Sequence, residues 1–315
     1  MPHRLHLLAF LAIVSAIALQ FPGNRARSAE PASQDAATPG PSRETPSTLD
    51  TVTVQARRDR EIKRQITKFV SGGVVTYRND SLERWNQPIC PLVAGVPSEQ
   101  AEFIRARVSE VARDSHAPLG AEHCNPNLVV VITNDPDLLL EKWDKRVRGL
   151  FNTCKGYGPV NTFLHSRQPV RVFYNAQFTS AAGGPGVGEL QLDGVNVPFP
   201  NDCLATASVD TWLHHGAVQE LTSVIIVVDG RQTTAINMGQ LADYIAMIGL
   251  AQIRVQADTG TAPSILHLFQ GSDPQPPGLS PWDEAFLQSL YTTDQSSVLE
   301  VPIIEDRMFK QIVGR

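Results

Sequence analysis

The chain has 315 residues, of which 42% are hydrophobic, so it is long and apolar enough to bury a sizeable core. Its formal net charge is −5, and no basic run is interleaved with aromatic residues, which argues against a nucleic-acid-binding protein. A G-x-S-x-G nucleophile motif is absent, and beyond the N-terminal segment no apolar run is long enough to span a membrane.

The first residues, 1–29, have the pattern of an export signal. A positive start at Arg4 is followed by a short apolar stretch from Leu7 to Leu19. Ala16-Ile17-Ala18 offers a small-residue cleavage site, and Ser28-Ala29 offers a poorer one. The alternative is an uncleaved N-terminal anchor. The signal predicts an exported protein, either periplasmic or secreted.

Residues 30–56 are rich in Pro, Ala, Ser and Thr, a composition that predicts a disordered tether. At its end, Leu49–Ala56 (LDTVTVQA) resembles a TonB box, the segment of outer-membrane transporters that adds as a strand to an energy-coupling protein. The resemblance implies an accessory role in TonB-linked transport. The alternative is a chance V-x-V strand that enters the domain.

Residues 57–315 form the predicted globular domain. A charged helix opens it, with an inward face comprising Ile62, Ile66, Phe69 and Val70. Buried strands are predicted at Asn127–Thr133, Pro169–Tyr174 and Leu221–Asp229, and a loop or edge strand at Trp85–Val96. The alternation of strands and helices predicts an α+β fold in which helices cover a mixed β-sheet.

Local signals place two further helices and one turn. Ser98 is the predicted cap of a helix that runs to about Ser115, with an inward face of Phe103, Ala106, Val111 and Ala112. Asp135-Pro136 begins the next helix, with Asp as the cap and Pro in the first position. The glycine-rich residues 180–194 predict a hairpin tip or an insertion, because the strand, helix and lysine of a phosphate loop are missing.

Four cysteines occur, at positions 90, 124, 154 and 203. In an exported protein an even number of cysteines favours disulfides, and the wide spacing excludes a C-x-x-C motif. Four cysteines can form two disulfides in three different ways, and the sequence does not decide among them. We expect Cys90–Cys124 and Cys154–Cys203, which join neighbours in sequence, with buried free thiols as the alternative.

The most informative stretch runs from Leu221 to Ile253. A β-branched strand ends at Asp229-Gly230, and a helix follows, for which Asn237 and Gln240 predict a capping box. Within this helix, Ala242–Leu250 (ADYIAMIGL) is similar to the zincin active-site helix HExxHxxGL.

The resemblance implies a zincin-like domain without its zinc site. The two ligand positions fall on Ala242 and Ala246, the general-base position on Asp243 and the third metzincin ligand on Gln252. An alanine methyl has no lone pair to give to a metal. The alternative is an ordinary buried helix, and neither reading predicts a bound metal.

A second segment, Pro263–Tyr291, resembles the end of a metzincin or matrixin-like domain. Ser264-Ile265-Leu266 corresponds to the methionine turn, and Leu279–Tyr291 to the last helix, which begins LSxxD and ends LY. Together the two segments imply a degenerate zincin-like fold.

Another class of function is open, a hydrolase with a relocated site. His214, His215 and Glu220 are its candidates, with Asp243 as an acid and His267 as a further ligand for a rebuilt zinc site. Asp229 and Asp243 are a further candidate acid pair. We favour a non-catalytic domain without a cofactor that binds a polypeptide partner in the cell envelope.

Overall fold

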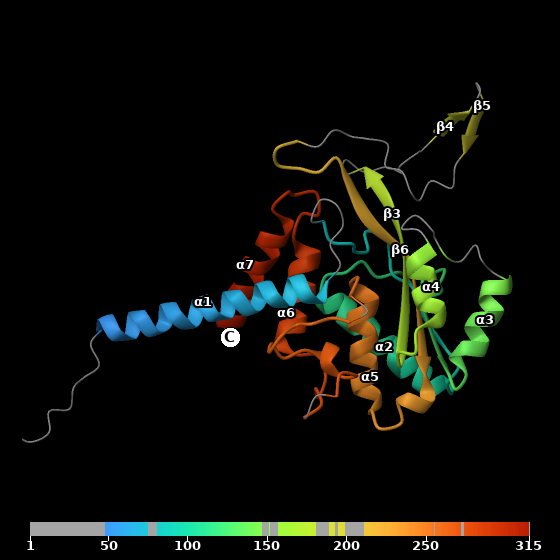
Figure 1. Ribbon diagram of the computed structural model, residues 1–315, viewed down its shortest axis with the longest axis horizontal. Helices are drawn as coiled ribbons and strands as arrows, with labels where there is room; N and C mark the ends of the chain where they lie inside the picture. The colour runs from blue at the N-terminus through green and yellow to red at the C-terminus, as the bar shows by residue number, and fades with distance from the viewer. Residues whose placement is uncertain are drawn as a thin grey trace, which may run out of the picture. The chain divides into compact units, whose positions relative to one another are not determined.

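The computed structural model of the chain describes residues 48–74, 81–146, 151, 157–180, 189–192, 195–198, 211–254, 256–271 and 274–314 (Figure 1). The predicted signal and most of the tether lie outside these ranges. No helix in the described part is both long and apolar enough to cross a membrane. The described residues belong to one compact unit that begins at Thr48.

A four-stranded open sheet lies at the centre of this unit. Its strands, in spatial order, are β1 (Pro91–Ala94), β2 (Leu128–Thr133), β6 (Ala217–Asp229) and β3 (Val170–Ser180). The first three are parallel, and β3 pairs with β6 in the antiparallel direction. The mixed sheet and its strands are as predicted. A separate antiparallel hairpin, β4 (Glu189–Leu192) and β5 (Val195–Pro198), begins within residues 180–194, for which the sequence predicts a hairpin tip or an insertion.

Helices cover both faces of the sheet (Figure 1). One face packs against α2 and α5, with α1, α6 and α7 beyond them, and the other face packs against α3 and α4. The helices are α1 (Thr48–Gly73), α2 (Ser98–Asp114), α3 (Pro136–Arg146), α4 (Tyr157–His165), α5 (Met238–Leu250), α6 (Pro281–Thr292) and α7 (Glu300–Val313). Short 3₁₀ turns occur at η3 (Gly230–Gln232) and η4 (Ile265–His267). The prediction of an α+β domain is confirmed.

Helix α5 is buried on nearly every side. The predicted capping box is present, since Asn237 Oδ1 accepts from Gln240 N and Gln240 Oε1 accepts from Asn237 N. At Gly249 the helix comes so close to the sheet that an added Cβ would lie 3.2 Å from both methyl carbons of Leu128. The indole of Trp85 donates to the carbonyl of Gly249 at 2.9 Å. This glycine therefore sets how deeply α5 packs.

The predicted face of α2 was wrong. Ser98 is the first helical residue rather than the cap, and Pro97 in the cap position makes no side-chain hydrogen bond. Phe103 is 48% exposed and Ala106 is also exposed, whereas Val111 and Ala112 are buried as expected. The helix instead buries Ile104 and Val108, because these positions complete the stripe that ends at residues 111 and 112.

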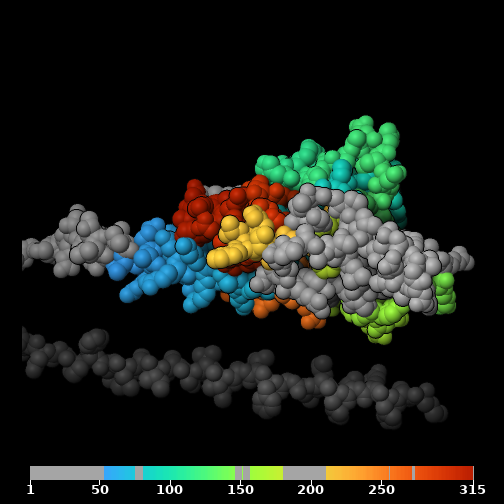
Figure 2. Space-filling model, turned by 90° about the horizontal axis from the view of Figure 1, so that it is seen from above, coloured from blue at the N-terminus to red at the C-terminus, as the bar shows by residue number. Residues whose placement is uncertain are grey.

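The strand expected within Leu49–Ala56 is also corrected, because these residues belong to α1. The inward face predicted further along is confirmed, with Ile66, Phe69 and Val70 buried. Helix α1 runs beside α7, as the adjoining blue and red residues show in Figure 2. Once a helix is packed against the domain, each residue added to its end gains a backbone hydrogen bond, so lengthening the helix costs little free energy. The V-x-V pattern is too weak a strand signal to prevent residues 49–56 from joining α1.

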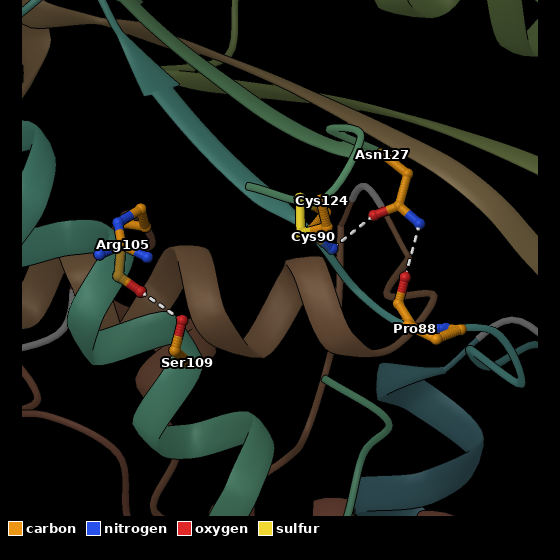
Figure 3. Close-up of a disulfide and its surroundings, with 6 residues drawn as sticks. All are labelled: Pro88, Cys90, Arg105, Ser109, Cys124 and Asn127. Carbon is orange, nitrogen blue, oxygen red and sulfur yellow. Dashed lines mark hydrogen bonds between the residues drawn. A yellow bond between two sulfur atoms is a disulfide. The ribbon is translucent and has the colours of Figure 1, made fainter. Parts of the chain in front are cut away.

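A disulfide joins Cys90 and Cys124, with 5.9 Å between their Cα atoms, as expected (Figure 3). Asn127, which directly precedes β2, supports it, since its Oδ1 accepts from Cys90 N at 2.7 Å and its Nδ2 donates to Pro88 O at 3.0 Å. The bridge therefore fixes the start of β1 against the start of β2. The expected partners Cys154 and Cys203 lie outside the described residues.

Candidate functional site: a groove at the edge of the sheet

The two positions that the zincin resemblance assigns to metal ligands are part of the core. Ala242 and Ala246 have no exposed surface, and their methyl groups pack among other apolar side chains. Asp243, in the general-base position, accepts from Arg107 Nε at 2.6 Å and from Leu279 N at 2.9 Å. Its carboxylate thus ties α5 to α2 and to the segment that precedes α6.

The second segment of the resemblance, Pro263–Tyr291, is held together by another buried carboxylate. Asp283, on the first turn of α6, accepts from Ser264 Oγ at 2.6 Å and from Ile265 N at 2.8 Å. It also accepts from Ser280 N at 2.8 Å, which completes a capping box for α6. Burial raises the pKa of Asp283 to about 6, although these hydrogen bonds oppose the shift. The turn η4 and the helix α6 are therefore one structural unit.

The structure does not bring the alternative catalytic residues together. His214 Nδ1 lies 3.0 Å from Ser296 Oγ, and His267 Nε2 lies 2.7 Å from Thr259 Oγ1. His215 donates its backbone N–H to Ser296 O, and Glu220 lies on β6 opposite Gln177 of β3. Partial burial raises the pKa of Glu220. In the described ranges, no three His, Cys, Asp or Glu side chains are grouped so that they could hold a metal.

The proposed acid pair of Asp229 and Asp243 is likewise not formed. Asp229 ends β6 and accepts from Arg231 N, while Arg231 and Gln232 donate to it from their side chains. These hydrogen bonds, that of Arg231 first, lower the pKa of Asp229 to about 2. Asp229 is a turn residue, and it shares no partner with Asp243.

A cavity of about 350 Å³ lies along β3, and no sequence motif indicated it. Five consecutive strand residues, 170–174, contribute to its lining. Alternate residues of a strand point to opposite faces, so a cavity that touches five in a row lies at the strand's edge. We call this cavity the edge groove. Its other lining residues are Pro159, Thr162, Phe163 and Ser166 from α4 and its end, and Tyr244, Ile248, Gln252, Ile253 and Arg254 from α5 and the chain that follows it.

The backbone of β3 presents hydrogen-bonding groups to this edge. Among the described residues, β3 has a strand partner only on the side of β6. Asp229 N donates to Pro169 O, which places the pair 169 and 229 in a hydrogen-bonded position of the antiparallel ladder. The N–H and C=O groups therefore alternate so that those of Val170, Val172 and Tyr174 point away from β6. An extended chain in the groove could pair with these groups.

The walls of the edge groove are fixed to the strand by two polar side chains. The hydroxyl of Tyr174 donates to Ile248 O at 2.8 Å and accepts from Ile253 N at 3.2 Å, which anchors the end of α5. Arg171 holds the opposite side, since it donates to Asp137 at 2.6 Å and to Leu164 O at 3.2 Å. Burial raises the pKa of Tyr244 to about 12, so its ring forms a neutral part of the wall.

The fold and this groove define an α+β protein that has an open mixed sheet and a groove at its antiparallel edge. Comparisons of the chain with protein-family models, with curated proteins and with solved structures give no match. The functional interpretation therefore rests on the chain's own residues.

Proposed function

We propose that this chain is an exported, non-catalytic zincin-like domain that binds an extended segment of a polypeptide partner in the edge groove. The observation that carries the proposal is that the antiparallel edge strand β3 opens into a cavity between helices on both faces of the sheet. Addition of a strand to an exposed edge is a common way to bind an extended peptide, because main-chain hydrogen bonds supply affinity and pockets supply specificity.

Two observations support the zincin-like part of the proposal. The segments that carry the resemblance interlock, because Asp243 of the first bonds to Leu279 of the second. Gly278 permits this contact, since an added Cβ would lie 2.5 Å from Asp243 Oδ2. The ligand positions hold alanine, and the base position is occupied by an ion pair with Arg107. These features fit a domain that keeps the arrangement of the segments without the chemistry.

The edge groove is suited to binding. Its walls include Phe163, Tyr244 and Ile248. One terminal nitrogen of the Arg171 guanidinium donates to Asp137, whereas its Nε has no partner among the described residues. Two consequences of strand addition can be tested directly: outward N–H groups of β3 must contribute, and the partner must be extended.

The test is selection of a phage-displayed library of linear peptides against the full mature protein. We expect peptides with strand-forming sequences, whose binding is lost in Val172→Pro, because proline removes an N–H that points toward the groove. Proline is tolerated at edge positions where the N–H does not join the ladder, so β3 should remain paired with β6. Val172→Ala is the matched control, because it removes most of the side chain and keeps the N–H.

Equal binding to the proline and alanine variants, with both folded by circular dichroism, would contradict strand addition. The non-catalytic assignment has a separate test in elemental analysis of the mature protein. One bound zinc per chain would show that a metal site exists elsewhere and would overturn that assignment.

A further inference from the structure

The lining of the edge groove carries positive charge and no negative charge. The described residues that line it include two arginines, Arg171 and Arg254, and neither an aspartate nor a glutamate. This contrasts with the whole chain, which has a formal net charge of −5. A cleft lined by one sign of charge concentrates ligands of the opposite sign. The lining therefore favours a partner segment that carries a negative group.

The two arginines differ in what their guanidinium groups contact. The side chain of Arg171 is only 4% exposed, and it donates to Asp137 at 2.6 Å and to Leu164 O at 3.2 Å. Asp137 belongs to α3, outside the lining, and it balances this charge. Arg254 is exposed, and its guanidinium forms no hydrogen bond or ion pair within the described part of the chain. The charge that a ligand can reach and pair with is therefore that of Arg254.

The backbone that carries Arg254 is held on both sides. Arg254 N donates to Gly73 O of α1 at 2.9 Å, and the preceding Ile253 N donates to the hydroxyl of Tyr174 at 3.2 Å. Ile253 also forms an antiparallel bridge with Val74. These contacts place Arg254 near the Tyr174 end of the stretch of β3 that lines the groove. A cation that extends from an ordered backbone loses less conformational freedom on binding than one on a mobile loop.

We propose that the edge groove takes an extended acidic polypeptide, and that Arg254 pairs with a carboxylate at the end of the segment that lies beside Tyr174. This inference rests on the proposed function, because it assumes that the segment pairs with β3. The main chain of the segment uses the outward N–H and C=O groups of β3, which leaves Arg254 for the carboxylate. A guanidinium matches a carboxylate with two parallel hydrogen bonds. The carboxylate can belong to an acidic side chain or to the partner's C-terminus.

The experiment titrates a set of acetylated peptides into the full mature protein by calorimetry. The neutral parent is Gln-Thr-Val-Thr-Val-Thr-Gln with an amidated C-terminus. Three acidic peptides have Glu in the first position, Glu in the last position, or the parent sequence with a free C-terminal carboxylate. A strand antiparallel to β3 places its N-terminal end beside Tyr174, and a parallel strand places its C-terminal end there. The peptide that binds most tightly therefore identifies both the direction of the segment and the source of the carboxylate.

We expect at least one acidic peptide to bind about fivefold more tightly than the neutral parent, because an exposed ion pair contributes up to about this factor. The gain should disappear at about 1 M salt, where charges are screened within about 3 Å.

The variant Arg254→Gln removes the charge, and we expect it to bind the neutral parent as the wild type does and to lose the preference for the acidic peptide. Arg254→Glu should reverse the preference, so that a peptide with Lys in place of the favoured Glu binds more tightly than the parent. The control is Arg58→Glu, which makes the same change of charge on an exposed residue of α1 outside the lining and should keep the acidic preference. An acidic-to-neutral ratio near one in the wild type, or an unchanged ratio in Arg254→Gln, would overturn the role of Arg254.

The outcomes separate the two proposals. Binding of all the peptides that is lost in Val172→Pro but insensitive to Arg254 would leave strand addition standing and refute the carboxylate site. Binding of an acidic peptide that depends on Arg254 but survives in Val172→Pro would keep the carboxylate site and refute strand addition. Binding of none of the peptides at millimolar concentration would refute both.

Discussion

The sharpest test of the role of Asp243 is its effect on stability. In the structure its carboxylate is 10% exposed and accepts two hydrogen bonds, from the guanidinium of Arg107 and from the backbone of Leu279. A general base would be free to take a proton from a substrate or water, whereas this carboxylate joins three segments. We therefore expect Asp243→Ala to unfold more readily.

The magnitude follows from the contacts. A hydrogen bond to a charged group contributes about 1.5–3 kcal/mol, and the variant also leaves the half-buried N–H of Leu279 without its acceptor. Arg107 keeps its ion pair with Glu110 and is 32% exposed, so its charge remains hydrated. We expect the free energy of unfolding to fall by about 3 kcal/mol in Asp243→Ala.

Urea denaturation followed by circular dichroism measures this loss. A double-mutant cycle with Arg107→Met should give a coupling energy of about 1–2 kcal/mol, because the two side chains share a partly buried ion pair. Glu141→Ala serves as the control, since it removes an exposed pair with Lys145 and should change stability by less than about 0.5 kcal/mol. A loss below about 0.5 kcal/mol in Asp243→Ala would refute the structural role and reopen the catalytic one.

Three further predictions follow from other contacts. Gly278→Ala should reproduce part of the loss seen in Asp243→Ala, because its methyl group would displace the carboxylate, and an unchanged urea midpoint would contradict this. The double variant Cys90→Ser with Cys124→Ser should lower the free energy of unfolding by about 4 kcal/mol, since the bridge closes a loop with a sequence separation of 34, and denaturation of the oxidised wild type is the reference. Burial raises the pKa of Glu300 from 4.5 to about 7, so its contribution to stability is fully present below pH 4.5 and falls as the pH rises through 7. Glu300→Gln should flatten this fall between pH 4.5 and 7, and identical pH profiles in both proteins would disprove it.

The sequence predicted those parts of the fold whose signals are local. The β-branched run of β6, the capping box at Asn237 and the Asp135-Pro136 start of α3 each specify an element within a few residues. The face of α2 was misjudged because Phe103 is apolar yet exposed, and composition alone does not distinguish it from Ile104, one residue away. The sequence predicts that α1 begins after Ala56, whereas it begins at Thr48. Packing of its second half stabilises the helix, and the preceding residues, whose strand signal is weak, continue it.

The edge groove could not be predicted, because it is assembled from three separate stretches. Its lining comes from residues 159–166, 170–174 and 244–254, and only the pairing of β3 with β6 decides which side of β3 is the outer edge. Gln252 corresponds to the third-ligand position of the resemblance. That its Oε1 is buried without a partner among the described residues depends on how the chain after α5 is held against Tyr174 of β3, which no local pattern connects to it.

The geometry of α5 places the two metal-ligand positions of the zincin resemblance on a different face of the helix from the edge groove. Ala242 and Ala246 lie one turn apart on the face that packs in the core, whereas Tyr244 and Ile248 lie one turn apart on the face that lines the groove. Successive residues are rotated by about 100°, so positions 242 and 244 point roughly opposite ways. Small apolar residues at 242 and 246 therefore consolidate the core without altering the wall of the groove. On this basis, a helix of this kind can carry no metal ligands and still present a binding surface.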